Sequence, residues 1–271
     1  MASLDEYDDG AIEACKSVMV EVLTILGKHR DHLVVVGGWV PPLLFGEGDH
    51  IGSIDVDLAV DWRAVPNHVY ETIKKELQAR RYSQESDDPP NRFRRVVQRG
   101  DDSYSVCVDI ITGESDEQGG QTHRVVQGMP VWCAKGVSVA LDNFIETEVT
   151  GTLPGGGENT VSTRVATVGA FLVMKGMALS ERMKEKDAYD VYYCCLHHPK
   201  GIDGLADELT QLMEIPTVTE SLQHIHDKFA TIESVGVVWA ASVVRDHGGD
   251  DEMARRDAFE RVQGLLAKLD E

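Results

Sequence analysis

The sequence contains no long apolar run. The longest such run, around Phe171–Met174, ends at Lys175, whereas a helix that spans a bilayer needs about 20 apolar residues. The residues that follow Met1 are acidic, where a secretory signal would be basic and then apolar. These absences argue against a transmembrane protein and against a protein secreted through a signal peptide. We therefore expect a cytoplasmic protein without a membrane partner.

Cysteine is scarce, and its spacing fits no disulfide framework. The sequence has five cysteines and no CxxC motif. An odd number without regular spacing favours buried, reduced thiols. We expect this state for Cys15, Cys107, Cys133, Cys194 and Cys195.

Positive charge is also in short supply. The chain has 26 Lys and Arg against 46 Asp and Glu, a formal net charge of −20. Such a chain repels nucleic acid at long range, and it suits a cationic small molecule or a basic protein partner. Hydrophobic residues make up 42% and charged residues 27%, which is the balance of a globular protein rather than a disordered one.

The hydrophobic pattern predicts an α+β fold in two modules. Residues 1–150 are expected to form an α/β core with a mixed sheet, and residues 160–271 a helical C-terminal module; the glycine-rich Gly151–Asn159 lies between them. The expected strands are His32–Val36, Asp55–Val60, Phe93–Gln98, Ser105–Ile111 and Val131–Ala134. The expected helices are Ala11–His29, Pro66–Arg80, Val137–Ile145, Thr167–Arg182, Lys186–Leu196, Gly204–Met213, Val218–Val238 and Glu252–Leu269.

A pair of alternating aspartates follows a strand that ends in two glycines. Residues i and i+2 of a strand point to one face, so Asp55 and Asp57 project side by side. Two carboxylates this close are unfavourable unless a cation lies between them, and oxygen ligands favour Mg²⁺ or Mn²⁺. Gly37 and Gly38 allow backbone N–H groups to approach a phosphate. Ser53 could offer a hydroxyl to the same phosphate.

This arrangement resembles the DNA polymerase β-like nucleotidyltransferase superfamily, in which a third carboxylate stands on a neighbouring strand. Asp109, at the end of an apolar strand, matches that position, although it could also be a strand-end capping residue. The resemblance implies that Asp55, Asp57 and Asp109 are catalytic metal ligands. It implies that the nucleotide is an NTP, bound by Gly37, Gly38 and Ser53.

A second set of polar residues lies in the helical region. Lys175, Arg182, Lys186 and Asp190 would share one side of a continuous helix. That helix would separate Lys175 from Asp190 by about 15 × 1.5 Å, roughly 22 Å, which is too far for one phosphate site. Either the helix breaks near Arg182–Lys186, or the two residues serve different ends of a site.

The spacing of these residues resembles the abortive-infection nucleotidyltransferase toxins of the AbiEii family. In that family the segment between the Lys and Asp motifs is often loop-like, which favours the broken helix. The resemblance implies that Lys175 contacts the nucleotide phosphates and that Asp190 acts on the acceptor hydroxyl, with Asp187 as a helix cap or a substitute. It also implies a toxin that transfers a nucleoside monophosphate to RNA, such as a tRNA 3′ end, or to protein, with an antitoxin as partner. Residues 197–271 match no known pattern.

Two other functions stay open. Aminoglycoside nucleotidyltransferases of the same superfamily modify a small cationic molecule, which suits the net acidity, and an inactive nucleotide-binding module would keep the fold without turnover. A run of arginines bears on whether the acceptor is a polyanion such as RNA. It could hold a triphosphate or an RNA backbone, or it could pair with local carboxylates. Its members are Arg92, Arg94, Arg95 and Arg99.

Overall fold

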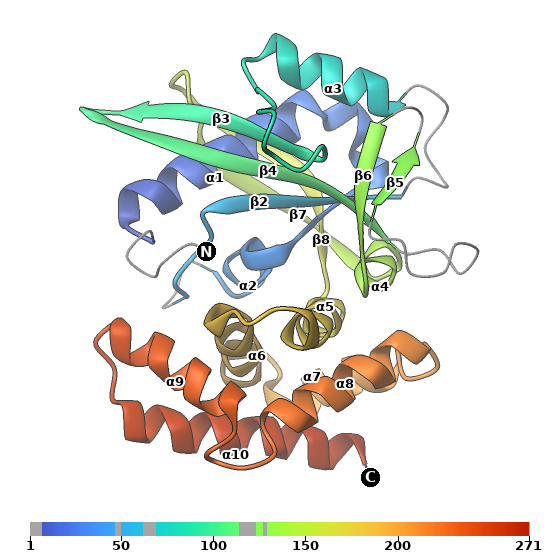
Figure 1. Ribbon diagram of the computed structural model, residues 1–271, viewed down its shortest axis with the longest axis vertical. Helices are drawn as coiled ribbons and strands as arrows, with labels where there is room; N and C mark the ends of the chain where they lie inside the picture. The colour runs from blue at the N-terminus through green and yellow to red at the C-terminus, as the bar shows by residue number, and fades with distance from the viewer. Residues whose placement is uncertain (1–6, 47–49, 62–68, 114–122, 127–128, 271) are drawn as a thin grey trace. The chain divides into compact units, whose positions relative to one another are not determined.

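The computed structural model describes residues 7–46, 50–61, 69–113, 123–126 and 129–270. It confirms a mixed α/β fold in which a mixed sheet is followed by helices (Figure 1). The chain divides into two compact units: Met1–Leu43 with Ile51–Ala166, here the sheet unit, and Leu44–His50 with Thr167–Glu271, here the helical unit. The short segment Leu44–His50 thus belongs to the helical unit, although it lies between two parts of the sheet unit in sequence.

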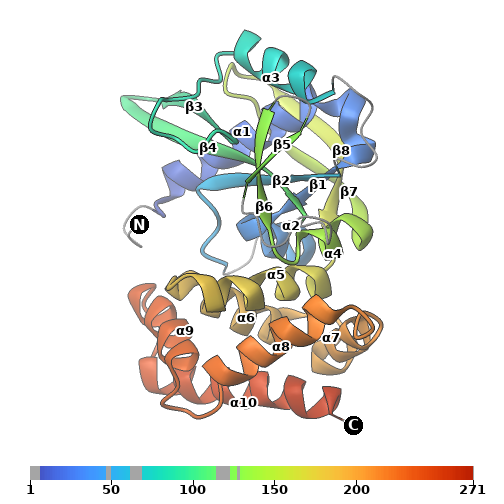
Figure 2. The same cartoon turned by 45° about the vertical axis from the view of Figure 1, so that its right-hand side comes forward.

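The sheet has both parallel and antiparallel pairs (Figure 2). Its strand order is β5-β6-β4-β2-β1-β8-β7, and β3 pairs with β4 beside this path. The pairs β2–β4, β4–β6 and β1–β8 are parallel, whereas β1–β2, β3–β4, β5–β6 and β7–β8 are antiparallel. The strands are β1 (Leu33–Val36), β2 (Asp55–Val60), β3 (Arg92–Arg99), β4 (Asp102–Gly113), β5 (His123–Val126), β6 (Met129–Ala134), β7 (Phe144–Thr152) and β8 (Glu158–Ala166).

Helices cover both faces of this sheet. Helix α1 (Asp9–Ile25) begins where the Asp8 side chain accepts a hydrogen bond from the backbone N–H of Ala11. It packs against strands of the sheet through a buried apolar stripe. On the opposite face lies α4 (Val137–Asp142), which packs against β1, β2 and β4. The remaining helical segments are η2 (Gly27–His32), η3 (Gly37–Trp39), α2 (Val40–Phe45) and α3 (Val69–Ala79).

Several boundaries differ from the sequence pattern for local reasons. The expected helix Val137–Ile145 ends at Asp142, because Phe144 already pairs with Ala166 in the β7–β8 hairpin. The glycine-rich stretch Gly151–Asn159 forms the end of that hairpin, and the two compact units divide after Ala166. Pro66, the expected start of a helix, lies outside the described residues.

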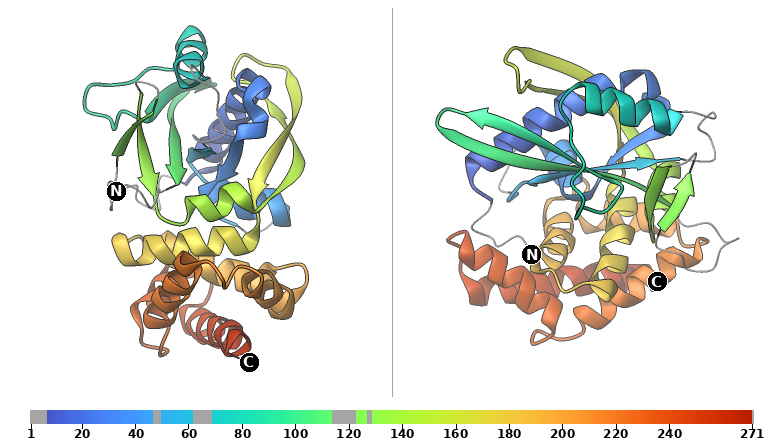
Figure 3. Two further views of the ribbon diagram at one scale, coloured as in Figure 1. Left: turned by 90° about the vertical axis from the view of Figure 1, so that its right-hand side faces the viewer. Right: turned by 45° about the horizontal axis from the view of Figure 1, so that its top comes forward.

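The helical unit is a bundle centred on α6, which contacts α5, α7, α9 and α10 (Figure 3). The expected helix Val218–Val238 is two helices, because the chain turns at Phe229 and α9 begins anew after Ser234. The helices are α5 (Val168–Glu181), α6 (Glu185–His197), α7 (Gly201–Thr210), α8 (Pro216–Lys228), α9 (Val235–Asp246) and α10 (Asp251–Leu269). Among the described residues, none of the helices combines the length and apolarity that a membrane crossing requires.

The cysteines are free thiols, as the sequence pattern predicts. Cys107 is half-buried, and the other cysteines are buried. Burial raises the pKa of Cys15 and Cys194 well above the ordinary thiol value. These two thiols therefore stay protonated at neutral pH.

Candidate active site

The three predicted carboxylates stand on one face of two adjoining strands. Asp57 of β2 is the direct register partner of Asp109 of β4, and Asp55 is the partner of Cys107. Neighbouring strands lie about 4.8 Å apart, and residues in register point to the same face. We call this set, Asp55, Asp57 and Asp109, the acidic face. By strand alternation, Cys107 and Gly113 lie on the same face of β4 as Asp109. A Cβ on Gly113 would meet Ser138, so α4 packs closely against this face at Gly113.

The glycine turn after β1 lies directly against the acidic face. Val36 of β1 is the register partner of Asp57, and Gly37 follows it with a φ of 71°. A Cβ on Gly37 would lie 2.0 Å from Oδ2 of Asp57, so a larger residue would displace this carboxylate. Gly37 and Gly38 form the short η3 turn that leads into α2. The predicted glycine pair and the predicted aspartate pair therefore meet in space.

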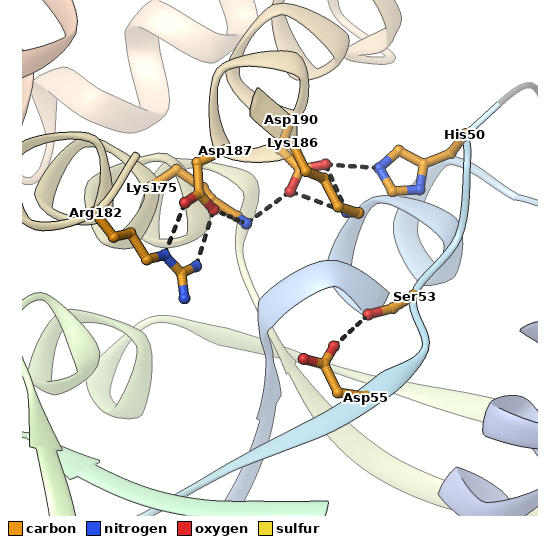
Figure 4. Close-up of polar contacts among 8 residues, drawn as sticks. All are labelled: His50, Ser53, Asp55, Lys175, Arg182, Lys186, Asp187 and Asp190. Carbon is orange, nitrogen blue, oxygen red and sulfur yellow. Dashed lines mark hydrogen bonds and ion pairs between the residues drawn. The ribbon is translucent and has the colours of Figure 1, made fainter. Parts of the chain in front are cut away.

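Ser53 lies beside the first aspartate. Its buried hydroxyl donates a 2.8 Å hydrogen bond to Oδ1 of Asp55 (Figure 4). This bond fixes the orientation of the Asp55 carboxylate at the start of β2. Ser53 thus lies next to the acidic face, but its hydroxyl is bonded to a carboxylate, whereas the sequence analysis assigns it to a phosphate; that assignment stays a prediction.

The third carboxylate has a partner that the sequence analysis did not assign. Arg92 of β3 is the antiparallel register partner of Asp109. Its Nε and Nη2 donate to Oδ1 and Oδ2 of Asp109 at 2.8 and 2.6 Å. These hydrogen bonds raise the pKa of Arg92, so the guanidinium stays charged. Both oxygens of Asp109 are therefore engaged by one arginine.

The acidic face offers the donor chemistry that Mg²⁺ or Mn²⁺ prefers. Its ligands would be carboxylate oxygens, on the two adjacent register positions of Asp57 and Asp109 and on Asp55. Over the described part of the chain, no three His, Cys, Asp or Glu side chains are gathered closely enough to form a ready-made metal site. The residue types fit the ion, while Asp109 is bonded to Arg92.

The remaining arginines of the run divide between the two faces of β3. Arg94 is the register partner of Cys107 and so shares the acidic side of the sheet, where it binds Asp88 through Nε and Nη2 at 2.6 and 2.7 Å. Arg95 points to the opposite face and binds Glu21 of α1 at 2.9 Å. These contacts match the alternative in which the arginines pair with local carboxylates.

A second set of charged residues is buried in the helical unit. Helix α5 ends at Glu181 and α6 begins at Glu185, so the helix is broken near Arg182–Lys186, the alternative that the family resemblance favours. The break folds the chain back, and Nζ of Lys175 lies 2.7 Å from Oδ1 of Asp187 and 2.7 Å from Oδ2 of Asp190. The broken-helix prediction is confirmed.

Further partners complete this set, which we call the buried ion network (Figure 4). Its buried members are Lys175, Asp187, Asp190 and His50, with Lys186 mostly buried and Arg182 half-exposed at the edge. Arg182 binds Asp187 with Nε and Nη2 at 2.8 and 2.9 Å. Lys186 binds Asp190 at 3.0 and 3.1 Å. Both aspartates that the sequence left as alternatives are thus buried and ion-paired.

His50 is the member of the network that the sequence did not reveal. Its Nε2 lies 3.0 Å from Oδ1 of Asp190, and its ring packs against Tyr189 and Tyr193 of α6. A histidine in a loop, remote in sequence from α6, carries no periodicity that could predict this contact. The contact holds the end of the segment Leu44–His50 in the helical unit.

The charge states of the network follow from burial and pairing. Burial alone would lower the pKa of Lys175, but Asp187 and Asp190 outweigh it and raise the pKa. Burial would raise the pKa of Asp190, but Lys175 and Lys186 bring it well below the ordinary value. Burial lowers the pKa of His50 to about 4. At neutral pH Lys175, Asp187 and Asp190 are charged, and a neutral His50 donates from Nε2 to Asp190.

Comparison with known proteins adds two structural likenesses. No protein-family model matches the chain, and no curated protein matches it. The crystal structure of JHP933 from Helicobacter pylori is 14% identical, with a TM-score of 0.47 over 97% of this chain and 94% of that one. A candidate nucleotidyltransferase from H. pylori is also 14% identical, with a TM-score of 0.43 over 94% of this chain and 96% of that one. At TM-scores under 0.5, neither likeness establishes the activity of this chain.

Proposed function

We propose that this protein is a metal-dependent nucleotidyltransferase, which moves a nucleoside monophosphate from an NTP to an acceptor hydroxyl. The observation that carries the proposal is the acidic face, where Asp57 is in register with Asp109 and packs against the glycine turn at Gly37. Carboxylates gathered beside a glycine turn suit a metal-bound polyphosphate, because glycine lets backbone N–H groups approach the phosphate closely. In the reaction, the acceptor oxygen forms a bond to the α-phosphorus, the bond from that phosphorus to the β-phosphate breaks, and pyrophosphate leaves.

Each residue of the acidic face has a role in this proposal. Asp55, Asp57 and Asp109 would hold Mg²⁺ or Mn²⁺, and Ser53 orients the Asp55 carboxylate through its hydrogen bond. The bound ions would stabilise the charge on the attacking and leaving oxygens of an in-line displacement. Gly37, followed by Gly38, would present backbone N–H groups to the phosphates.

The buried ion network supplies the other two assigned residues. We assign Lys175 to the nucleotide phosphates and Asp190 to the acceptor hydroxyl, on the resemblance of their motif to the AbiEii family. The assignment of Asp190 rests on that resemblance, because Lys175 and Lys186 hold the pKa of its buried carboxylate well below the ordinary value, which weakens it as a base. In that role the hydroxyl proton would move toward a carboxylate oxygen as the new bond forms.

Two acceptor classes follow from different observations. The family resemblance favours RNA, such as a tRNA 3′ end, or a protein hydroxyl, and with it a toxin that an antitoxin protein restrains. A small cationic acceptor is favoured by the net charge of −20 and by the ion pairs of Arg92, Arg94 and Arg95, which leave these arginines engaged with carboxylates.

Incubation with labelled NTPs and Mg²⁺ tests the function. The acceptors are total tRNA, a protein extract and an aminoglycoside panel, and Asp57→Asn is compared with Asp101→Asn, a substitution in the exposed turn between β3 and β4. We expect transfer to one acceptor class, a loss of at least about a hundredfold in Asp57→Asn, and no change in Asp101→Asn. Transfer that survives in Asp57→Asn would remove the acidic face from the reaction, and no transfer to any acceptor would favour the inactive binding module.

A further inference from the structure

The bond between Arg92 and Asp109 sets one of the three carboxylates apart from the other two. Asp109 is the register neighbour of Asp57, yet both its oxygens accept hydrogen bonds from one guanidinium. We propose that Arg92 is a nucleotide-responsive residue: it bonds to Asp109 as long as no nucleotide competes for it, and it transfers to the phosphates when a nucleoside triphosphate binds. This inference rests on the proposed function, because it concerns the same acidic face.

Competition for oxygen atoms is the first step of the argument. An arginine fork and a divalent cation both bind a carboxylate through its two oxygens. Arg92 keeps its positive charge, because a guanidinium does not deprotonate in proteins. A divalent ion that reached Asp109 would therefore meet a fixed positive charge at hydrogen-bond distance from its ligand. Metal binding at the acidic face is opposed as long as Arg92 stays on Asp109.

The second step is that a polyphosphate offers Arg92 an equivalent partner. Phosphate oxygens match the guanidinium fork in the same geometry as a carboxylate. Arg92 lies on the same face as Asp57, two strands away, which corresponds to about 10 Å between their backbones. Its side chain is 31% exposed, whereas that of Asp109 is 12% exposed. The more exposed guanidinium can leave the carboxylate and reach an anion above the acidic face.

The two steps predict that metal and nucleotide assist each other. Without nucleotide, Arg92 would neutralise Asp109, so a divalent ion would be attracted by Asp55 and Asp57 alone and would bind weakly. With a triphosphate bound, Arg92 would bind phosphate oxygens, and Asp109 would become available as a ligand to the ion that accompanies the nucleotide. Arg92 would then act as a binding residue for the NTP phosphates and as a gate on the third metal ligand.

The neighbouring arginine provides a matched control. Arg94 lies on the same strand and the same face, and it forms an equivalent fork with a carboxylate. Its partner is Asp88, which precedes β3 and stands outside the acidic face. Arg94→Gln therefore removes the same side-chain charge and the same type of ion pair without touching Asp109.

The experiment measures two ligands that need no turnover. Mn²⁺ binding without nucleotide is followed by electron paramagnetic resonance, and tripolyphosphate binding in EDTA by calorimetry. We expect Arg92→Gln to bind Mn²⁺ roughly tenfold more tightly, the scale on which groups bonded to a metal's ligands change its affinity. The same variant should bind tripolyphosphate several-fold more weakly. Arg94→Gln should leave the affinity for Mn²⁺ unchanged.

Opposite changes for the two ligands would not follow from a merely structural arginine. Equal or weaker Mn²⁺ binding in Arg92→Gln would overturn the proposal, because Arg92 would then orient Asp109 for the ion.

Arg92→Lys keeps the charge without the fork. It should therefore raise the affinity for Mn²⁺ and lower the affinity for tripolyphosphate by smaller factors than Arg92→Gln, and it decides the case if Arg92→Gln does not fold. Asp57→Asn tests the metal site separately from its control by Arg92. Mn²⁺ binding that survives in Asp57→Asn would refute the proposed metal site itself.

Discussion

Nζ of Lys175 lies 2.7 Å from Oδ2 of Asp190, although a continuous helix would hold the two residues roughly 22 Å apart. The break between α5 and α6 makes this contact possible. Lys175 is buried, and it bridges Asp190 to Asp187. A buried cation shared by two carboxylates neutralises charge that would otherwise oppose the packing of α5 on α6.

Lys175→Met should destabilise the fold strongly. The substitution removes the cation that Asp187 and Asp190 share, and an uncompensated buried charge typically costs about 3–5 kcal/mol. Urea unfolding measures the change. Lys268→Met, which breaks a half-exposed ion pair with Asp203, should cost less than about 1 kcal/mol. Similar losses in both variants would show that the network contributes no more than a surface pair.

The helix break shows what the sequence could predict about this network. The good helix formers around Arg182 indicate one helix, and the separation of Lys175 from Asp190 on that helix leaves two alternatives, a break or residues at different ends of a site. The resemblance to the AbiEii family favours the break, so neither local propensity nor the distance alone predicts it. The contact of His50 with Asp190 could not be predicted, because it depends on how a loop remote in sequence packs against α6.

His50 predicts a loss of stability in mild acid. Its side chain is 1% exposed, and burial lowers its pKa to about 4, against 6.5 in the unfolded chain. Between these values the unfolded state binds more protons, so the free energy of unfolding falls as the pH falls. Asp190, Lys186 and Lys175 are the charged groups that act on it.

From pH 7 to pH 5 the expected decrease is up to about 2 kcal/mol. Urea unfolding at several pH values measures it. In His50→Gln the titrating ring is gone while an amide donor to Asp190 remains, so this part of the pH dependence should disappear. A pH profile that is identical in the variant would assign the acid sensitivity to other groups.

Arg95 should prove structural. It binds Glu21 of α1, and Tyr82 donates to the same carboxylate. Because Arg95 and Glu21 are both largely buried, Arg95→Gln should lower the free energy of unfolding by about 1.5–3 kcal/mol, the range for hydrogen bonds to charged groups. Arg99→Gln is the control on the same strand and face.

Arg99 lies 3.8 Å from Glu13 and both side chains are exposed, so its substitution should change stability by less than about 1 kcal/mol. Thermal and urea unfolding of the two variants provide the comparison. If Arg95→Gln instead kept its stability and changed the acceptor KM, the arginine would belong to a substrate surface.

Strand alternation accounts for the division of the arginine run. In a strand, Arg92 and Arg94 must face one side and Arg95 the other, so a single surface of four arginines was never compatible with the predicted strand. The pairing of Arg92 with Asp109 is different, because it depends on the register of β3 against β4. The two-residue turn Gly100-Asp101 fixes that register: Arg99 pairs with Asp102, and each step back along β3 then pairs with one step forward along β4 as far as Arg92 and Asp109.

Gly37→Ala should disable the acidic face while leaving the fold intact. A Cβ at this position would lie 2.0 Å from Oδ2 of Asp57, so the carboxylate must move. The φ of 71° adds strain of about 1–2 kcal/mol for a residue with a Cβ. We expect Mn²⁺ affinity and nucleotide transfer to fall by at least about tenfold.

Gly100→Ala separates the effect of the collision from that of backbone strain. Gly100 has a φ of 61°, and a Cβ there would have open space around it. Both variants should therefore lose a similar amount of thermal stability, because both force alanine into the left-handed region. Only Gly37→Ala should lose Mn²⁺ binding, since only its Cβ meets a carboxylate of the acidic face. Equal Mn²⁺ affinity in the two variants would show that Asp57 does not bind the metal in the position that Gly37 leaves open for it.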